Sequence, residues 1–215
     1  MLAATLAAGF ATAPLHAAPE PASTGNVDTA WILSRLAWPA PSQTPFVELR
    51  DSRLLKAPLR ISGTYRRPDG ATLVREVRAP YAETTTIRAG EAVIERAGKS
   101  ARRFSLSRVP ELAGLQASFG ALLSGDGERL QRHYAIRSEG TRAHWTLLLT
   151  PKDAALAAKV ERVVLHGRGS ELRCIESIPL DGAVQRTLLA GAARDAAGVE
   201  SAQALAALCD GRDNG

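Results

Sequence analysis

The clearest structural signal in the sequence runs from Leu59 to Tyr81 and reads LRISGTYRRPDGATLVREVRAPY. Apolar and polar side chains alternate in the first part, which is the period of a half-buried strand. The Arg-Pro-Asp-Gly segment at 67–70 has turn chemistry, because proline presets one backbone dihedral and glycine tolerates positive φ. A second strand follows over 72–81, so the stretch predicts an antiparallel hairpin. Its shared face carries Leu59, Ile61, Gly63, Tyr65, Leu73, Val77, Ala79 and Tyr81.

Short strand signals continue on the C-terminal side of this hairpin, for a total of about nine to eleven strands. They fall at 84–87, 92–94, 102–106, 131–137, 143–150, 160–166, 171–177 and 183–189. Helices do not alternate with them, so a doubly wound parallel sheet is excluded and an antiparallel meander is predicted.

Three segments have helical signals. Asn26 or Asp28 can cap a helix around Trp31 that ends at Pro39. Between 111 and 123 the apolar residues recur at helical spacing, and Gly125-Asp126-Gly127 is predicted to end that helix. Residues 200–209 form a third, C-terminal helix in this interpretation.

Composition limits the class of protein. The chain has 215 residues, of which 45% are apolar and 23% are charged, with a formal net charge of +5. These values are typical of a globular protein with one sizeable core. No apolar run reaches the roughly 18 to 20 residues that a helix needs to cross a bilayer. Arginines are spread along the chain, so the positive charge does not predict a nucleic-acid-binding surface.

The N-terminal segment is typical of an exported protein. Residues 1–18 contain no Lys, Arg, Asp or Glu and are dominated by Ala and Leu, as in a secretory signal peptide whose basic start is missing. The alternative is an apolar amphipathic helix. Residues 19–26 are predicted to be a linker, and 27–210 a single domain.

A single antiparallel sheet with this many strands must curl or close to hide its apolar face. With so few helices to cover it, we expect a curled sheet with a helical lid. Aromatic residues make up only 5% of the chain, so the interior would be mainly aliphatic and would suit acyl chains. A completely filled core would give the same periodicity, and this alternative stays open.

A longer stretch around the hairpin resembles a known family. From Phe46 the sequence reads FVELRDSRLLKAPLRISGTYRRPDGATLVREV, followed by Pro80 and a strand that ends at Ala89-Gly90. The order of strand, Gly-x-aromatic, Arg-Pro turn, strand, proline and strand with a Gly turn resembles the LolA family of outer-membrane lipoprotein carriers, within a LolA-related subgroup. The similarity extends over about residues 27 to 190.

This resemblance implies an incomplete antiparallel β-barrel, with helices that plug its mouth and an apolar cavity for acyl chains. It implies a periplasmic carrier without enzymatic activity or cofactor, which would take an acylated lipoprotein or fatty-acyl lipid from an inner-membrane donor to an outer-membrane acceptor, as a monomer. The apolar side chains expected at the cavity are Trp31, Leu36, Phe46, Leu49, Leu59, Ile61, Tyr65, Leu73, Val77, Tyr81, Ile87, Phe104, Leu115, Phe119, Trp145 and Leu147.

One polar residue is singled out by the resemblance. The carriers have an arginine after the first long strand that bonds to backbone near the lid, and Arg67 occupies the matching place. The alternative is an ordinary surface arginine in a turn. Aromatic residues that recur on the next strand of the carriers are replaced by Leu73 and Val77. The cargo therefore stays open between a lipoprotein and another lipid.

The two cysteines, Cys174 and Cys209, are separated by 35 positions. In an oxidising compartment they could form one disulfide bond that joins the C-terminal helix to the sheet. The alternative is two separate buried thiols.

A search for catalytic or metal-binding patterns finds none. There is no Gly-x-Ser-x-Gly motif, and His133, His144 and His166 lack metal-ligand spacing. We therefore expect neither a catalytic nor a metal site. A partner-binding sensor of envelope stress with the same fold is the alternative function, and an acyl-transferring enzyme is a third.

Overall fold

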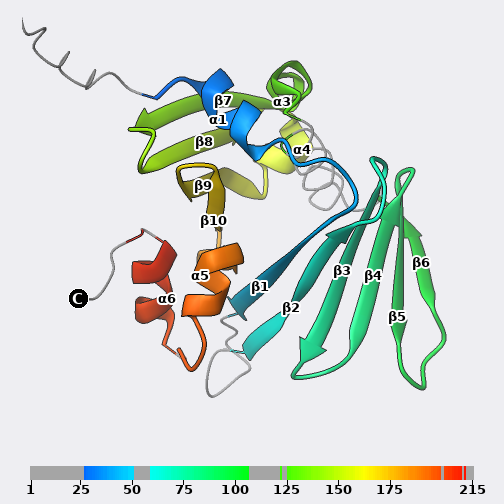
Figure 1. Cartoon of the computed structure of the whole chain (residues 1–215). Coiled ribbons are helices and arrows are strands. Elements are labelled where there is room, and N and C mark those ends of the chain that lie inside the picture. Colours follow the sequence, from blue (N-terminus) through cyan, green and yellow to red (C-terminus); the bar gives the residue numbers. More distant parts are fainter. Residues whose placement is uncertain are drawn as a thin grey trace, which may run out of the picture.

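All the strands described belong to one antiparallel sheet. The computed structural model describes residues 27–50, 59–106, 122, 125–199, 201–209 and 211. The sheet has eleven strands in the order β6-β5-β4-β3-β2-β1-β11-β10-β9-β8-β7 (Figure 1). Their bounds are β1 Ser42–Arg50, β2 Leu59–Arg67, β3 Thr72–Ala79, β4 Glu83–Arg88, β5 Glu91–Arg96, β6 Arg102–Ser105, β7 Tyr134–Gly140, β8 Trp145–Pro151, β9 Val160–Arg168, β10 Glu171–Pro179 and β11 Gln185–Leu189.

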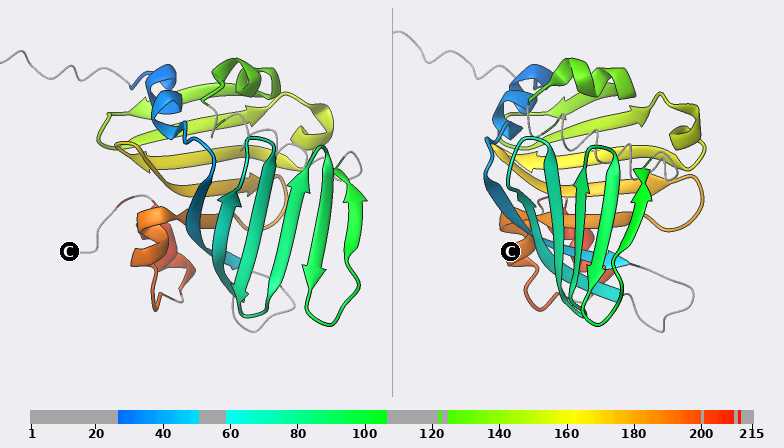
Figure 2. Two further views of the ribbon diagram at one scale, coloured as in Figure 1. Left: turned by 45° about the vertical axis from the view of Figure 1, so that its right-hand side comes forward. Right: turned by 90° about the vertical axis from the view of Figure 1, so that its right-hand side faces the viewer.

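The sheet is strongly curled but not closed. Figure 2 shows the half that contains β2 to β6 standing steeply against the half that contains β7 to β10. In the described part of the chain the two end strands, β6 and β7, do not pair with each other. The predicted incomplete antiparallel barrel is therefore confirmed.

Alternate residues of each strand point to opposite sides of the sheet, which has an inner, concave face and an outer face. On β1, Phe46 pairs with Leu189 of β11 and joins the main core on the inner face. The next pair, Val47 and Leu188, belongs to a second core on the outer face. Side chains alternate between the two sides of a strand, so each position along β1 is assigned to one core or the other.

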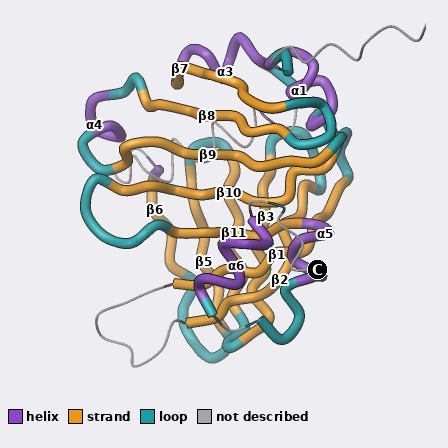
Figure 3. The backbone as a smooth tube through the Cα atoms, turned by 90° about the vertical axis from the view of Figure 1, so that its left-hand side faces the viewer, coloured by secondary structure: helices purple, strands orange, loops and turns teal. Residues whose placement is uncertain are grey.

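The described helices divide between these two faces. They are α1 Thr29–Leu36, α3 Gly127–His133, α4 Ala154–Ala157, α5 Ala190–Asp195 and α6 Ala202–Cys209. Helix α1 is capped by Asp28 and buries Ile32, Leu33 and Leu36 in the inner core, where it contacts β7 and β10. Helices α5 and α6 pack on the outer face, toward the viewer in Figure 3. No helix in the described residues has the length and apolarity to span a bilayer.

The hairpin of β2 and β3 has the expected position, and the backbones of neighbouring strands approach closely at its centre. Gly63 lies beside Phe46 on the inner face, next to a register shift between β2 and β3. A Cβ atom at this position would come within 1.9 Å of the Glu76 carbonyl oxygen and 3.0 Å of the Phe46 ring. Glycine is therefore required for β1, β2 and β3 to approach each other here.

One local expectation is wrong. Residues 131–133 belong to α3 and not to a strand, and β7 starts only at Tyr134. The predicted helix end at 125–127 agrees with the described residues, since Leu122 is helical, the Gly125 amide donates to the Leu122 carbonyl at 3.1 Å and Gly125 has a φ of 69°. The same segment also begins α3, because the Asp126 carboxylate accepts from the Arg129 amide at 2.8 Å. Short polar residues favour N-caps, which explains why the Gly-Asp-Gly sequence starts a helix. The predicted signal peptide 1–18, the linker 19–26 and nearly all of the helix at 111–123 lie outside the described residues.

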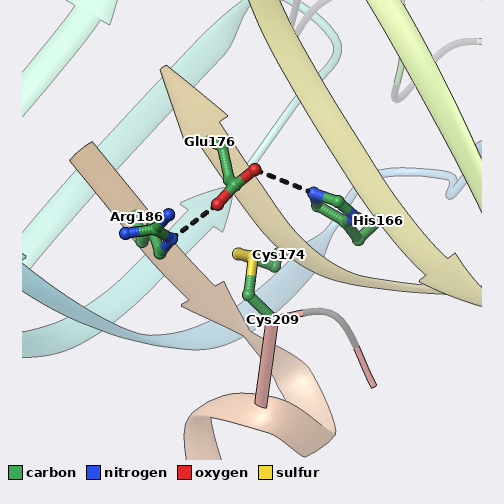
Figure 4. Close-up of a disulfide and its surroundings, with 5 residues drawn as sticks. All are labelled: His166, Cys174, Glu176, Arg186 and Cys209. Carbon is green, nitrogen blue, oxygen red and sulfur yellow. Dashed lines mark hydrogen bonds and ion pairs between the residues drawn. A yellow bond between two sulfur atoms is a disulfide. The ribbon is translucent and has the colours of Figure 1, made fainter. Parts of the chain in front are cut away.

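The predicted disulfide bond is confirmed. Cys174 of β10 and Cys209 at the end of α6 are joined, and both are buried in the outer core. Figure 4 shows the bridge beside His166, Glu176 and Arg186. The bond attaches the C-terminal helix covalently to the centre of the sheet.

Candidate functional site

Two cavities lie on the inner side of the curled sheet. One, the inner cavity, has a volume of about 400 Å³ and is bounded by β1 to β6 on one side and by β9 to β11 on the other. The second, the rim cavity, has a volume of about 410 Å³ and lies between α1, the start of β1 and the β10–β11 end of the sheet. Tyr65 and Leu73 line both. Each volume falls within the range of small-molecule sites, about 300 to 1,000 Å³.

The two walls of the inner cavity differ in chemistry. The wall from α4 and β9 to β11 is uncharged in the described residues, with aliphatic and small polar side chains. The wall from β1 to β6 combines apolar residues with charged ones. Apolar side chains that line the cavity are Leu73, Ile87, Ile94, Phe104, Leu156, Val160, Val163 and Ile175.

Four charged residues of the second wall, together with Arg96 beyond the cavity lining, form an alternating row, here called the charged row: Arg50, Glu48, Arg75, Glu83 and Arg96. Glu48 Oε1 lies 2.6 Å from Arg50 Nε, and its Oε2 lies 2.9 Å from Arg75 Nη2. Glu83 Oε2 lies 2.5 Å from Arg96 Nε, and its Oε1 lies 4.0 Å from Arg75 Nη1. The two carboxylates are only 5% and 9% exposed, and the guanidinium partners offset the cost of burying their charge.

Arg75 stands at the centre of this row. Its side chain is 16% exposed, and its guanidinium carbon lies 4.8 Å from the centre of the Phe46 ring. The Phe46 ring in turn lies 4.7 Å from that of Tyr65. Burial raises the pKa of the Tyr65 phenol, although the charge of Arg75 and a hydrogen bond between the two side chains oppose this. Arg75, Phe46 and Tyr65 therefore form one connected group at the centre of the wall.

The rim cavity contains the arginine that the sequence singled out. Arg67 is the last residue of β2 and is buried, and its Nη1 donates to the Trp38 carbonyl at 2.8 Å. This bond ties the hairpin to the segment between α1 and β1, and both residues line the rim cavity. The alternative of a solvated turn arginine does not hold. The role of Arg67 in opening and closing a helical lid stays a prediction.

Replacement of Arg67 by methionine should loosen the segment between α1 and β1. Loss of this part-buried, charge-assisted hydrogen bond is expected to cost about 1 to 3 kcal/mol in the free energy of unfolding. Hydrogen exchange of residues 37–42 should accelerate. Arg66→Met is the matched control, because Arg66 is half exposed and pairs with Glu76 only at 3.7 Å. Equal effects of the two variants in urea unfolding and hydrogen exchange would contradict the assignment.

The structure separates the predicted cavity residues into several groups. Those that line one of the two cavities are Leu36, Tyr65, Leu73, Ile87 and Phe104. Those that belong to the inner core or pack against it, without lining either cavity, are Trp31, Phe46, Leu59, Ile61, Val77, Tyr81, Trp145 and Leu147. Leu115 and Phe119 lie outside the described residues. The open alternative of a filled core thus applies to a large part of the inner face.

Leu49 requires a correction. It lies in the outer core with Cys174, beneath α5 and α6, and not with the inner cavity. The physical reason is parity, since Leu49 is three positions from Phe46 and side chains alternate along a strand. The inward positions of this part of β1 are Phe46, Glu48 and Arg50.

Sequence analysis did not identify the charged row. The signal was present, because Glu48 and Arg75 share a face with apolar neighbours at a spacing of two. A charged residue at such a position in a half-buried strand indicates either an ion pair or a ligand-binding site. The partners across strands could not be assigned without the register.

The outer face has one group of possible metal ligands in the described residues: His166, Glu176 and Cys209, with donor atoms within 4.8 Å of one another. The Cys209 sulfur is bonded to Cys174, so it is not available as a thiolate. A hydrogen bond from His166 lowers the pKa of Glu176, although burial opposes this, and Arg186 contributes a second bond. The cluster thus forms an ion-pair network that neighbours the disulfide.

Comparison with known proteins identifies the family. The model of the family described as outer membrane lipoprotein carrier protein LolA-like matches residues 21–212. The chain therefore belongs to the LolA-like family, which confirms the resemblance seen in its sequence. No curated protein matches.

Three solved structures are similar to this chain. A LolA superfamily protein from Nitrosomonas europaea has 17% identity over 73% of this chain and 74% of its own, with a TM-score of 0.38. A chain of the MucA/MucB complex of Pseudomonas aeruginosa has 19% sequence identity over 76% of this chain and 56% of its own length, with a TM-score of 0.40. LprF from Mycobacterium bovis has 11% sequence identity over 78% of this chain and 94% of its own length, with a TM-score of 0.33.

Proposed function

We propose that this protein is a periplasmic carrier that holds the acyl chain of a lipoprotein or of another lipid in its inner cavity and delivers the cargo toward the outer membrane. The observation that carries the proposal is the inner cavity itself, a space between the two halves of one curled sheet with one uncharged wall and many aliphatic lining residues. Membership of a family described as lipoprotein carriers supports it. The transfer partners would be an inner-membrane donor and an outer-membrane acceptor.

Burial of hydrocarbon supplies the binding energy in this proposal. Each buried methylene contributes about 0.8 kcal/mol, so a long acyl chain can bind tightly even after the cost of association. The aliphatic wall of β9 to β11 suits a flexible chain, because it presents no charge that the chain would have to desolvate. The rim cavity, which shares Tyr65 and Leu73, extends the apolar surface toward α1. Binding and release need no chemical step, and we propose that the protein is not an enzyme.

Native mass spectrometry of the protein purified from its own periplasm tests this function. We expect a fraction with the added mass of one lipid or lipoprotein acyl group, which organic extraction removes. A lipid-free protein that copurifies in stoichiometric amount with another protein would contradict the carrier and support the sensor of envelope stress. Turnover of an acyl ester by the purified protein would contradict the absence of enzymatic activity.

A further inference from the structure

We propose that the rim cavity and the inner cavity form one site in series for a single long acyl chain, and that Leu73 is the gate between them. This inference rests on the proposed function, because it assigns the path of the hydrocarbon chain through the same protein. It makes Leu73 a specificity-determining residue, since only a chain long enough to pass this side chain gains the contacts of the inner cavity. The protein would therefore select long acyl chains over short ones.

The first argument is the position of the two residues that the cavities share. Tyr65 of β2 and Leu73 of β3 line both cavities, whereas every other described lining residue belongs to one cavity only. Tyr65 lies opposite Arg75 in the β2–β3 register, and Leu73 is two positions from Arg75 on the same strand. Tyr65 and Leu73 are therefore diagonal neighbours on one face of the sheet, which is close enough for long side chains to touch. The two cavities, of about 410 and 400 Å³, meet at this pair.

The second argument is that Leu73 can move more easily than Tyr65. The Tyr65 ring lies 4.7 Å from the ring of Phe46, and the Tyr65 side chain is hydrogen-bonded to Arg75. Leu73 is only partly buried and has apolar contacts, with the main inner core and with a smaller cluster around Ile87. A leucine can change its rotamer without breaking a hydrogen bond, and such changes are fast compared with ligand binding. Leu73 is thus the movable half of the divider, and Tyr65 is the fixed half.

The third argument concerns the two ends of the path. The rim cavity is lined by Trp38, which is 54% exposed, so apolar surface reaches solvent there. The inner cavity is lined by most of the charged row, and Arg50 at the end of that row has a side chain that is 47% exposed. A hydrocarbon that entered past these charges would have to remove water from them. Of the charged residues in the rim lining, Arg194 is exposed, and Arg67 and Glu171 are hydrogen-bonded to backbone groups. The chain thus enters through the rim cavity, and its end reaches the inner cavity.

Binding of a series of fatty acids from decanoate to palmitate tests the inference. In wild type the affinity should rise by about fourfold for each added methylene, because each one is buried along the path. In Leu73→Trp the larger indole closes the passage, so the rise should stop at the chain length that fills the rim cavity. If three methylenes of palmitate lose their burial, its affinity falls by about 60-fold. The affinity for decanoate should stay close to that of wild type.

Leu172→Trp is the matched control, because Leu172 lines the rim cavity but not the inner cavity. This indole should weaken the binding of every acid by a similar factor and leave the rise per methylene unchanged. If the ratio of palmitate to decanoate affinity is the same in Leu73→Trp and wild type, the gate is wrong while the carrier function stands. Two palmitate molecules bound per protein would also contradict a single path. If no acid binds to wild type, the proposed carrier function fails and the inference fails with it.

A second variant keeps the test valid if Leu73→Trp does not fold. Leu73→Ala removes the side chain that must move, so palmitate should associate several-fold faster than with wild type in stopped-flow measurements. Decanoate, which stays in the rim cavity, should associate at the wild-type rate. Leu172→Ala shortens a side chain of the rim cavity only and should leave the ratio of the two rates unchanged. An unchanged palmitate rate in a folded Leu73→Ala protein would overturn the assignment of the gate.

Discussion

Removal of the disulfide bond is expected to lower the free energy of unfolding by about 3 to 4 kcal/mol on the loop-entropy estimate. Cys174 and Cys209 are separated by 35 positions, so the bond restricts a long loop in the unfolded chain. The double variant Cys174→Ala/Cys209→Ala should show this loss in urea unfolding. Amide exchange in α6 should accelerate before that in β10, because α6 contacts the sheet mainly along β11 and β10.

The reduced wild-type protein is the control for this prediction. It keeps both sulfur atoms in the outer core, so it separates the loss of the crosslink from the loss of packing around two buried side chains. Similar losses in the reduced protein and the double variant would show that the crosslink carries the effect. A loss below about 1 kcal/mol in both would mean that packing of Leu205 and its neighbours alone holds α6.

A tryptophan at position 85 is expected to block acyl-chain binding. Thr85 lies opposite Arg75 in the β3–β4 register and lines the inner cavity. An indole at this position would occupy part of the cavity volume that the bound acyl chain needs. If about three methylenes lose their burial, the cost is about 2.4 kcal/mol, or about 60-fold in Kd. Binding of a fluorescent fatty acid measures the change.

The neighbouring threonine provides the matched control. Thr86 lies on the same strand with opposite side-chain parity and does not line the inner cavity. Thr86→Trp adds the same ring to the outer face and should leave fatty-acid affinity within about twofold of wild type. Equal losses in the two variants, with both folded by circular dichroism, would place the binding site elsewhere.

The fold was predictable because local signals and long-range structure agree. Alternation in β2 and β3, the Arg-Pro-Asp-Gly turn between them and the lack of helices between strands together specify a meander. The Gly-Asp-Gly segment at 125–127 was predicted only to end a helix, but the same residue types also favour the start of the next helix, which the sequence pattern did not reveal. Only the structure shows that Asp126 caps α3.

The site was less predictable than the fold for a physical reason. Periodicity assigns a residue to a face, but it does not distinguish a side chain that fills the core from one that lines a cavity. Leu147 and Leu73 have equivalent patterns, yet Leu147 is fully buried and Leu73 borders both cavities. Arg67 was found through a family resemblance. Glu48 and Arg75 were missed because ion pairs across strands depend on register, and one-residue shifts reverse the face.

Photo-crosslinking with a fatty acid that carries a diazirine near the middle of its chain tests the acyl-chain site in the inner cavity directly. After irradiation, mass spectrometry of the peptides locates the adducts. The account predicts adducts on the inward-facing residues of β4 and β10, such as Ile87 and Ile175, which Thr85→Trp abolishes and Thr86→Trp preserves. Adducts confined to the outer face, around α5 and α6, would contradict an acyl-chain site in the inner cavity.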